Sequence, residues 1–371
     1  MNQRTNHLDK IHLALVPNKH MEWIKTRSLF MCVAGSRAYG TSTPASDWDY
    51  RGVVVAPRVY RDGYLHKFEQ LVLKDPDCTI FDIRKFFKLA ADSNPNVLEL
   101  LWLDDTSYVE KGIGFDLLRQ NRSLFLSKKA LHTFVGYSIS QLKRINSHKK
   151  WLLEPPTHQP TREEFGLAAL PEIPKSQRDA AMAAIRKRID SWELDLRDMA
   201  ASDKIDVLTK IRESLAEMQI ASSAKFAAAA RLIGYSENFL QLLERERRYK
   251  DAVKNWQQYN DWKLKRNKKR AKLESNYGYD TKHGMHLVRL MRMCEEILTE
   301  GVVLVKRPDA KELLAIRNGA WSYDKLVSWA KDKEVELLEL SRVSALPKRP
   351  PHKQLDKLCC ELTAMVDKAN E

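Results

Sequence analysis

The sequence predicts an α+β fold in which a small sheet comes first and helices follow. Apolar runs of strand length, separated by turn residues, occupy roughly residues 28–81. From Ile83 onward the apolar residues recur at helical spacing, with basic residues on the opposite side. After residue 175 the pattern is helical almost throughout and rich in Ala, Leu, Glu, Lys and Arg. The order of these patterns separates sheet and helices along the chain.

Five prolines between residues 152 and 175 interrupt both kinds of pattern, because proline disfavours helix and sheet interiors alike. We therefore expect three parts: a first domain at 1–151, a proline-rich connecting loop at 152–175, and a helical domain at 176–371 that binds substrate.

The composition indicates what kind of protein this is and what kind of partner it binds. The 371 residues suffice for two domains with cores, and no apolar run approaches the length of a membrane span. The five cysteines show no paired spacing, which favours reduced thiols in a cytoplasm and no disulfide-linked partner. The net charge of +14 favours a polyanionic partner, most simply nucleic acid.

A strand–turn–strand pattern carries the clearest chemical signal. An apolar run at 29–34 leads into Gly35 and Ser36, and a second apolar run at 52–55 leads away. Asp47 and Asp49 lie two apart at the start of the second run. Because strand side chains alternate between faces, we expect both carboxylates to point the same way and Trp48 to pack inward.

These residue types together indicate phosphate chemistry. Two close carboxylates repel each other unless a cation lies between them, and Mg²⁺ prefers one or two carboxylates together with substrate phosphates. Gly35 lets backbone N–H groups approach a phosphate, and Ser36 adds a hydroxyl. The pattern therefore predicts phosphoryl or nucleotidyl transfer, although a structural hairpin with two surface Asp residues would produce it too.

A Gly-Ser turn followed by Asp-x-Asp resembles the nucleotidyltransferase superfamily of DNA polymerase beta. That superfamily has a third carboxylate on a later strand, and Asp77 matches it best. Asp82 is the rival, but it occupies a helix-capping position before Ile83. The stretches GSRAYGTSTPASDWDYRG, DCTIFDIRKFF, NPNVLELLW and YDTKHGMHLVRL resemble a branch found in bacteria and phages and in part associated with RNA-repair gene sets.

The resemblance implies a small mixed sheet with flanking helices and Mg²⁺-dependent transfer of a nucleoside monophosphate from an NTP. It implies two Mg²⁺ ions, for which Mn²⁺ can substitute. Asp47 and Asp49 would hold both ions, and Asp77 would bind one and help to deprotonate the acceptor. Gly35 and Ser36 would hold the β and γ phosphates. Arg37 is a further candidate for that task, as is Lys85, whose helix face is otherwise simply solvated.

A polar stripe on a later helix is a second candidate region. After a cap at Asp280 or Thr281, one face carries Lys282, His283, His286 and Arg289. We expect His283, His286 and Arg289 to bind nucleotide, whereas two histidines without another ligand make a poor zinc site. The alternative is buried histidines bonded to backbone carbonyls. Glu99, within an apolar run, is expected to pair with a nearby Lys or Arg.

The positive charge is concentrated in residues 244–272, which hold twelve Lys or Arg against four Asp or Glu, a surplus of +8. Interleaved aromatics there either stack on bases or form a buried helical stripe. The residues expected to bind nucleic acid are Lys263, Lys265, Arg266, Lys268, Lys269 and Arg270.

The expected function is therefore nucleotidyl transfer to RNA, such as a tRNA or a damaged RNA end, in the cytoplasm of a bacterial cell, by a host or phage protein. Modification of a protein or small molecule is an alternative enzymatic function. A binding protein that senses NTP without catalysis is the alternative from another class. The choice of NTP, the number of nucleotides added and the oligomeric state stay open.

Overall fold

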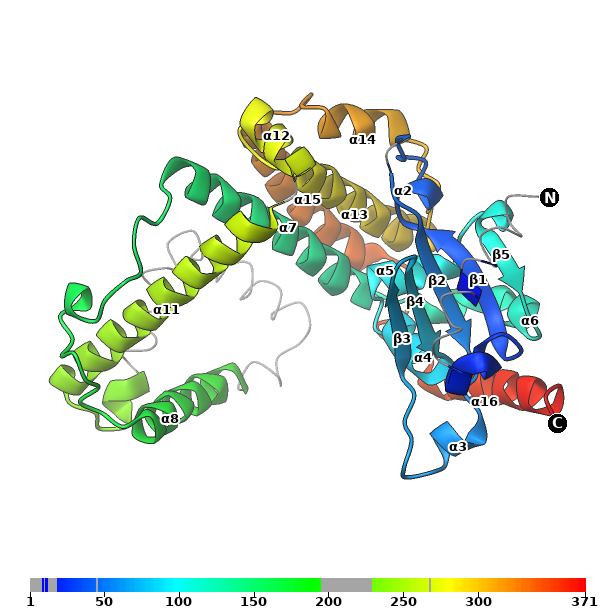
Figure 1. Ribbon diagram of the computed structural model, residues 1–371, viewed down its shortest axis with the longest axis horizontal. Helices are drawn as coiled ribbons and strands as arrows, with labels where there is room; N and C mark the ends of the chain where they lie inside the picture. Colours follow the sequence, from blue (N-terminus) through cyan, green and yellow to red (C-terminus); the bar gives the residue numbers. More distant parts are fainter. Residues whose placement is uncertain (1–8, 10, 13–18, 45, 195–228, 267) are drawn as a thin grey trace. The chain divides into compact units, whose positions relative to one another are not determined.

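The computed structural model describes residues 9, 11–12, 19–44, 46–194, 229–266 and 268–371, and the side chains at 19–20, 189–194 and 268–270 lie outside this description. The chain forms two compact units (Figure 1). The first combines Met1–Leu152 with Asn267–Glu371, and the second is Leu153–Arg266. Each unit is described by itself.

The first unit is built on a mixed sheet. Its strands lie in the order β3-β4-β2-β1-β5, where β2 and β4 run parallel and every other neighbouring pair is antiparallel. This arrangement confirms the expected α+β class. The strands are β1 (Ser28–Ala34), β2 (Asp49–Val54), β3 (Gln70–Lys74), β4 (Asp77–Asp82) and β5 (Tyr108–Lys111).

Helices of the same unit come from both ends of the chain. The first part contributes α2 (Gly35–Ala38), α3 (Arg58–Arg61), α4 (Ile83–Ala91), α5 (Pro95–Leu98), α6 (Phe115–Gln120) and α7 (Lys129–Leu153). The last part contributes α12 (Lys268–Tyr277), α13 (Thr281–Glu300), α14 (Ala310–Arg317), α15 (Tyr323–Val343) and α16 (His352–Lys368). Short 3-10 turns are η1 (Lys19–Ile24), η2 (Glu99–Leu101), η3 (Asp105–Ser107) and η4 (Arg122–Phe125).

Both faces of the sheet are covered, which explains why β1 is buried at all seven positions. From Phe30 to Ala34, alternate residues of the strand belong to two different apolar clusters. Phe30 packs in the larger cluster, together with Val288 of α13 and Leu362 of α16. Met31 packs in the smaller cluster with Ile24 of η1. Strand β1 therefore lies between two apolar cores, one on each face of the sheet.

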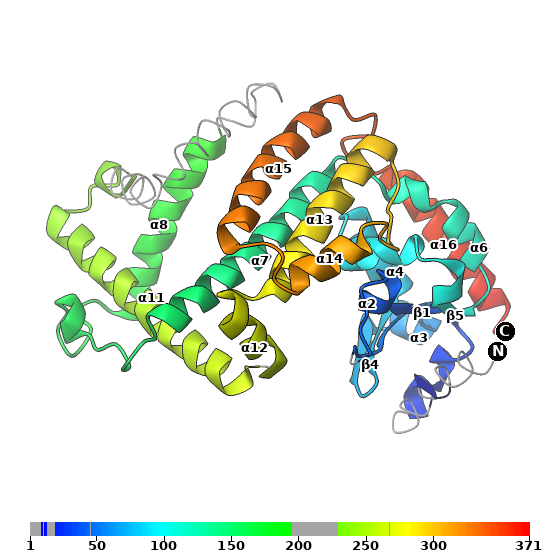
Figure 2. The same cartoon turned by 90° about the horizontal axis from the view of Figure 1, so that it is seen from above.

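The compact units divide the chain differently from the expected domains, because residues 267–371 join the sheet rather than the preceding helices. The reason lies in α13, where thirteen of twenty residues are buried. A helix that is buried on most sides needs neighbours all round. It lies beside α14 and α15 (Figures 1 and 2). The expected helical domain at 176–371 is therefore distributed over both units.

The second unit contains η5 (Glu163–Phe165), α8 (Lys175–Leu194) and α11 (Glu237–Lys265). The carboxylate of Glu246 on α11 is buried and accepts hydrogen bonds from Arg162 at 2.5 Å and from Arg178 at 2.6 Å. These bonds fasten the proline-rich segment and α8 to α11. Across the described residues of both units, no helix is long and apolar enough to cross a membrane.

Candidate active site

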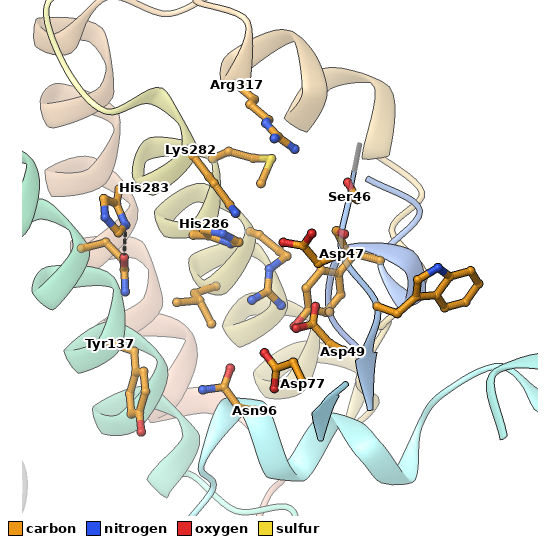
Figure 3. Close-up of a pocket in the computed structure, with 18 of the residues that line it drawn as sticks. Ser46, Asp47, Asp49, Asp77, Asn96, Tyr137, Lys282, His283, His286 and Arg317 are labelled. Atoms are coloured by element: carbon orange, nitrogen blue, oxygen red, sulfur yellow. Dashed lines mark hydrogen bonds between the residues drawn. The ribbon is translucent and has the colours of Figure 1, made fainter. Parts of the chain in front are cut away.

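Two carboxylates meet at one end of the sheet because two neighbouring strands run parallel. Asp49 is the first residue of β2, and Asp77 is the first residue of β4. The register pairs Tyr50 with Cys78, one residue further along each strand, so Asp49 and Asp77 lie at the same level. Both side chains point into a shared cavity (Figure 3).

Asp47 reaches this cavity from a different kind of segment than expected. It lies just before β2 in chain without helix or strand, so strand alternation does not align it with Asp49. Its carboxylate nevertheless lines the same cavity (Figure 3). Trp48 does not pack inward as expected, because it is 37% exposed and lies beneath the guanidinium of Arg37.

The electrostatics of Asp49 indicate a place for a cation. Burial raises the pKa of Asp49, and the negative charge of Asp77 raises it further. Arg51 and Lys282 act in the opposite direction on that pKa. Arg51 also lies 3.3 Å from Asp77, measured from Nη1 to Oδ1. The negative charge of these two neighbouring carboxylates is only partly compensated by Arg51 and Lys282. Such a pair suits a divalent cation that prefers oxygen ligands, such as Mg²⁺.

Gly35 makes room for the Asp49 carboxylate. Its φ of +66° is in the left-handed region, and a Cβ placed there would lie 2.1 Å from Oδ2 of Asp49. No other residue type satisfies both the backbone conformation and this spacing. The sequence predicted a glycine for close approach to a phosphate, and the structure adds close approach to a carboxylate.

The cavity has a volume of about 1700 Å³, and it gathers residues from distant parts of the first unit. Eight of the ten residues expected at the catalytic or nucleotide site line it: Gly35, Ser36, Asp47, Asp49, Asp77, His283, His286 and Arg289. Asp82 does not line it, and its Oδ1 instead accepts a hydrogen bond from the backbone N–H of Arg84, 3.0 Å away. Its expected role as a helix cap is confirmed.

The other two expected residues have partners elsewhere. Nη2 of Arg37 donates to the carbonyl of Ser46 over 2.9 Å, and its guanidinium lies 3.7 Å from the Trp48 ring centroid. Arg37 thus braces the segment that carries Asp47. Nζ of Lys85 lies 3.3 Å from a carboxylate oxygen of Glu69, and Lys85 is not among the residues that line the cavity.

Arg289 lines the cavity but is already engaged. It is 4% exposed, its Nη1 lies 3.4 Å from Oε2 of Glu99, and its guanidinium stacks 3.8 Å from the Tyr39 ring centroid. The Tyr39 hydroxyl donates to the other oxygen of Glu99 over 2.6 Å. Burial raises the pKa of Glu99, and Arg289 lowers it. The expected pairing of Glu99 with a basic residue is confirmed.

His283 is buried and contacts the side chain of Gln141. It is 4% exposed, and its Nδ1 lies 2.6 Å from Oε1 of Gln141 on α7. Its Nε2 lies 3.5 Å from Oδ2 of Asp280, whose Oδ1 caps α13 as expected. His286 lines the cavity on the same helix (Figure 3).

The cavity contains further residues beside the catalytic and nucleotide-binding candidates. Lys282 and Arg317 extend their nitrogen atoms toward the space beside Asp47 (Figure 3). Lys282 shares the spacing of the polar stripe on α13, which was the available signal. Asn96, Tyr137 and Gln141 also line the cavity. Their patterns are ordinary for surface residues, so the sequence offered no signal for them.

A separate group of ligand-type side chains lies around the start of α13. One ligand atom from each of His148, Glu274 and Asp280 lies within 4.8 Å of the others. Nδ1 of His148 is 3.0 Å from Oε1 of Glu274. This group is distinct from the cavity carboxylates, and it does not include His286.

The basic segment is described only in part. Lys263 and Lys265 are exposed near the end of α11, and Lys265 lies 3.4 Å from Asp261. The guanidinium of Arg266 lies 4.5 Å from the Trp262 ring centroid. The side chains of Lys268, Lys269 and Arg270 lie outside the described part of the chain.

Part of the chain matches a known protein family. Residues 8–155 match the model of RlaP, the RNA repair pathway DNA polymerase beta family. Over these residues the chain is similar to polymerase beta-like nucleotidyltransferases of the RNA repair branch. The match covers the strands that carry Asp49 and Asp77, and it excludes the helix that carries His283.

A phage protein is similar over part of its length. The uncharacterized 38.9 kDa protein in the nrdC-mobD intergenic region of Enterobacteria phage T4 is 28% identical over 124 residues. The match covers 30% of this chain and 36% of the phage protein, so the chain spans only about a third of that curated relative. No solved structure matches the chain significantly.

Proposed function

We propose that the protein transfers a nucleoside monophosphate from a nucleoside triphosphate to an acceptor hydroxyl and releases pyrophosphate. The observation that carries this proposal is the carboxylate pair, in which Asp49 and Asp77 open neighbouring parallel strands beside Gly35. Asp47 lines the same cavity. The RNA repair branch of the matched family supports the same activity.

In the proposed reaction the acceptor oxygen bonds to the α-phosphorus. The bond from that phosphorus to the oxygen bridging toward the β-phosphate breaks, and pyrophosphate leaves with the bonding electrons. Asp77, whose side chain is 54% exposed, takes the proton of the acceptor hydroxyl. Asp47 and Asp49 would hold both metal ions, and Asp77 would hold one of them. When bound, two Mg²⁺ ions, or Mn²⁺ in their place, supply positive charge to the phosphates and acidify the acceptor.

The phosphates are assigned to the side of the cavity near Ser36. Gly35 and Ser36 orient the β and γ phosphates, while Lys282 and Arg317 offset the charge of the leaving pyrophosphate. His286 is a further nucleotide contact. Arg37 contributes by bracing the segment of Asp47 rather than by direct binding, and Lys85 is left with its partner Glu69.

The proposed acceptor is an RNA end. The family description names an RNA repair pathway, and the chain has a net charge of +14 with a surplus of +8 in residues 244–272. A concentrated positive charge releases counterions on binding a phosphate backbone. A tRNA and a damaged RNA end are both substrates of this proposed class.

The test supplies purified protein with Mg²⁺, each α-labelled NTP in turn and a mixed pool of small RNAs. We expect label in RNA from the unaltered protein, and a loss of at least about 100-fold in Asp49→Asn and Asp77→Asn. The matched control is Asp62→Asn, an exposed carboxylate outside the cavity, which should retain full activity.

Three results would contradict the proposal in different ways. Label on protein instead of RNA would replace the RNA acceptor by a protein side chain. Full activity in Asp49→Asn would overturn the assignment of the carboxylates. Tight NTP and RNA binding without any label would replace the enzyme by a binding protein that senses NTP.

A further inference from the structure

The cavity has chemically different walls. The carboxylates lie on the sheet side, and Lys282 and Arg317 point toward Asp47 (Figure 3). Asn96 and Tyr137 lie away from these cations and carry no charge (Figure 3). A volume of about 1700 Å³ exceeds the roughly 300–1,000 Å³ of common small-molecule pockets, so the cavity has room beyond a triphosphate.

One face of α7 contributes four residues to the cavity, of which only Arg144 is charged. The cavity is lined by Tyr137 and by the residues three, four and seven positions after it, which are Ser140, Gln141 and Arg144. Such spacing places them along one stripe of the helix. Because a helix is rigid, the stripe holds its side chains at fixed spacing.

Tyr137 presents an aromatic ring that is held in place and remains accessible. It is 37% exposed, although it lines a cavity. Its hydroxyl accepts a hydrogen bond from Nδ2 of Asn94 over 3.0 Å. Oδ1 of Asn94 in turn accepts from the backbone N–H of Asn96 and caps α5. An accessible and braced ring of this kind is a stacking surface for a planar ligand.

Two side-chain amides accompany the ring. Oε1 of Gln141 is engaged by His283 over 2.6 Å, which leaves the Nε2 donors of the amide for the cavity. Asn96 is exposed, and the described hydrogen bonds involve only its backbone. Amide groups donate and accept at once, so they match the edges of nucleobases rather than phosphates.

We propose that Tyr137, Gln141 and Asn96 form a nucleobase subsite on the α7 side of the cavity. Tyr137 stacks on the base, and the two amides contact its edge. His283 and Asp280 are positioning residues that orient Gln141. This inference rests on the proposed nucleotidyl transfer, which places the phosphates on the opposite side. The bound base belongs either to the incoming NTP or to the last nucleotide of the acceptor RNA, and both sources share this chemistry.

The first experiment measures equilibrium binding to the full-length protein in Mg²⁺. The ligands are each of the four NTPs, inorganic tripolyphosphate and a single-stranded RNA oligonucleotide. We expect Tyr137→Leu to weaken binding about tenfold for at least one NTP or for the RNA, because stacking on the ring is lost. Tripolyphosphate, which has no base, should bind equally to both proteins.

Two variants separate stacking from structural effects. Tyr137→Phe keeps the ring and removes only the hydroxyl, so its affinities should stay within about twofold of the unaltered protein. Tyr64→Leu makes the same change at a side chain that is 94% exposed and outside the cavity, and it should change nothing. Equal melting temperatures in all variants would show that the fold is intact.

The amide is tested by specificity instead of affinity. Gln141→Leu should change the ratio of affinities between two bases by about tenfold, with tripolyphosphate binding unchanged. His283→Asn should cause a smaller change in the same ratio, because it acts only by orienting Gln141. A purely structural role would lower all affinities together.

The outcomes distinguish this inference from the proposed function. Weakening for an NTP assigns the subsite to the incoming nucleotide, and weakening for RNA alone assigns it to the acceptor. Unchanged binding of every base-containing ligand in Tyr137→Leu and Gln141→Leu, with tripolyphosphate still bound, would overturn the subsite and leave nucleotidyl transfer standing. No binding of NTP or tripolyphosphate to the unaltered protein would overturn both.

Discussion

At single residues, the tightest constraint in the cavity is the approach of Gly35 to Asp49. A carboxylate oxygen stands where a Cβ of residue 35 would be, and the positive φ excludes most other residues as well. The placement of Asp49 beside Asp77 therefore depends on a residue without a side chain.

We predict that Gly35→Ala displaces the Asp49 carboxylate, lowering nucleotidyl transfer by about 100-fold and stability by about 1–2 kcal/mol. The measurement is turnover together with urea unfolding. Gly40→Ala is the matched control, since it has a similar φ of +73° but its nearest neighbour would be Ala310 Cβ at 3.8 Å. The control should lose similar stability and keep its activity. Equal activity losses in the two variants would refute the explanation.

A second residue outside the cavity gives a prediction about pH. Burial raises the pKa of Glu110 on β5 from 4.5 to about 7, and its Oε2 has no hydrogen-bond partner among the described residues. Between these values the folded state binds more protons than the unfolded state, so the free energy of unfolding falls as pH rises.

Glu110→Gln removes this titration. We expect the variant to be more stable than the unaltered protein at about pH 8, by about 1 kcal/mol after allowance for partial exposure, and nearly equal at about pH 5. Thermal unfolding at both pH values measures the difference. Glu361→Gln on the exposed side of α16 makes the same change at a solvent-exposed carboxylate and serves as the control. An equal difference at both pH values would contradict the titration of Glu110.

At the level of elements, α13 connects the helical part of the first unit to the sheet. Arg289 on this helix reaches Glu99 of η2 and the ring of Tyr39 just after α2. Glu99 is 2% exposed, so it depends on these partners for its charge. The same ion pair therefore holds three elements around the cavity.

We predict that Arg289→Met destabilises the protein by about 3–5 kcal/mol, because it leaves the buried Glu99 without its cation. The double variant Glu99→Gln, Arg289→Met should recover most of this loss in urea unfolding. The single variant should also bind NTP more weakly, because the elements around the cavity are loosened. If Arg289 acts only through the ion pair, the double variant should recover this NTP affinity as well. Persistent loss of NTP affinity in a stable double variant would instead mark Arg289 as a direct nucleotide contact, as the sequence first predicted.

For the whole molecule, some of the basic residues expected to bind nucleic acid belong to a different unit from the carboxylates. The carboxylates belong to the first unit, while Lys263, Lys265 and Arg266 belong to the second. Basic residues that bind an RNA backbone act by releasing counterions. Their contribution to RNA affinity therefore depends on the salt concentration and not on the chemistry of the cavity.

We predict that replacing Lys263, Lys265 and Arg266 together by Ala weakens RNA binding and reduces its salt dependence. The slope of log affinity against log salt should fall by about two, given roughly 0.7 per phosphate contact for single strands. Tripolyphosphate binding should stay unchanged. Replacing the exposed Lys348, Lys353 and Lys357 removes the same charge elsewhere and is the control. Equal effects of the two triple variants would assign RNA binding to net charge alone.

Much of the cavity was predictable because its residues carry local signals. A glycine before a serine, two acids two residues apart and a third acid opening a strand are visible as short patterns. The capping role of Asp82 and the pairing of Glu99 were predictable for the same reason, since caps and buried charges have restricted partners. The α+β class followed from the change of period at Ile83.

Other features depend on contacts between distant segments, which no local pattern records. The parallel register of β2 and β4 brings Asp49 beside Asp77, and packing of α13 against the sheet moves residues 267–371 into the first unit. Lys85 and Arg37 carry the right charge, but their partners Glu69 and Trp48 were decided by packing. Tyr137 and Gln141 came to the cavity in the same way. The sequence determined which chemistry is present, because that depends on residue types, and tertiary structure decided which of those residues share one cavity, because that depends on burial of apolar faces far apart in the chain.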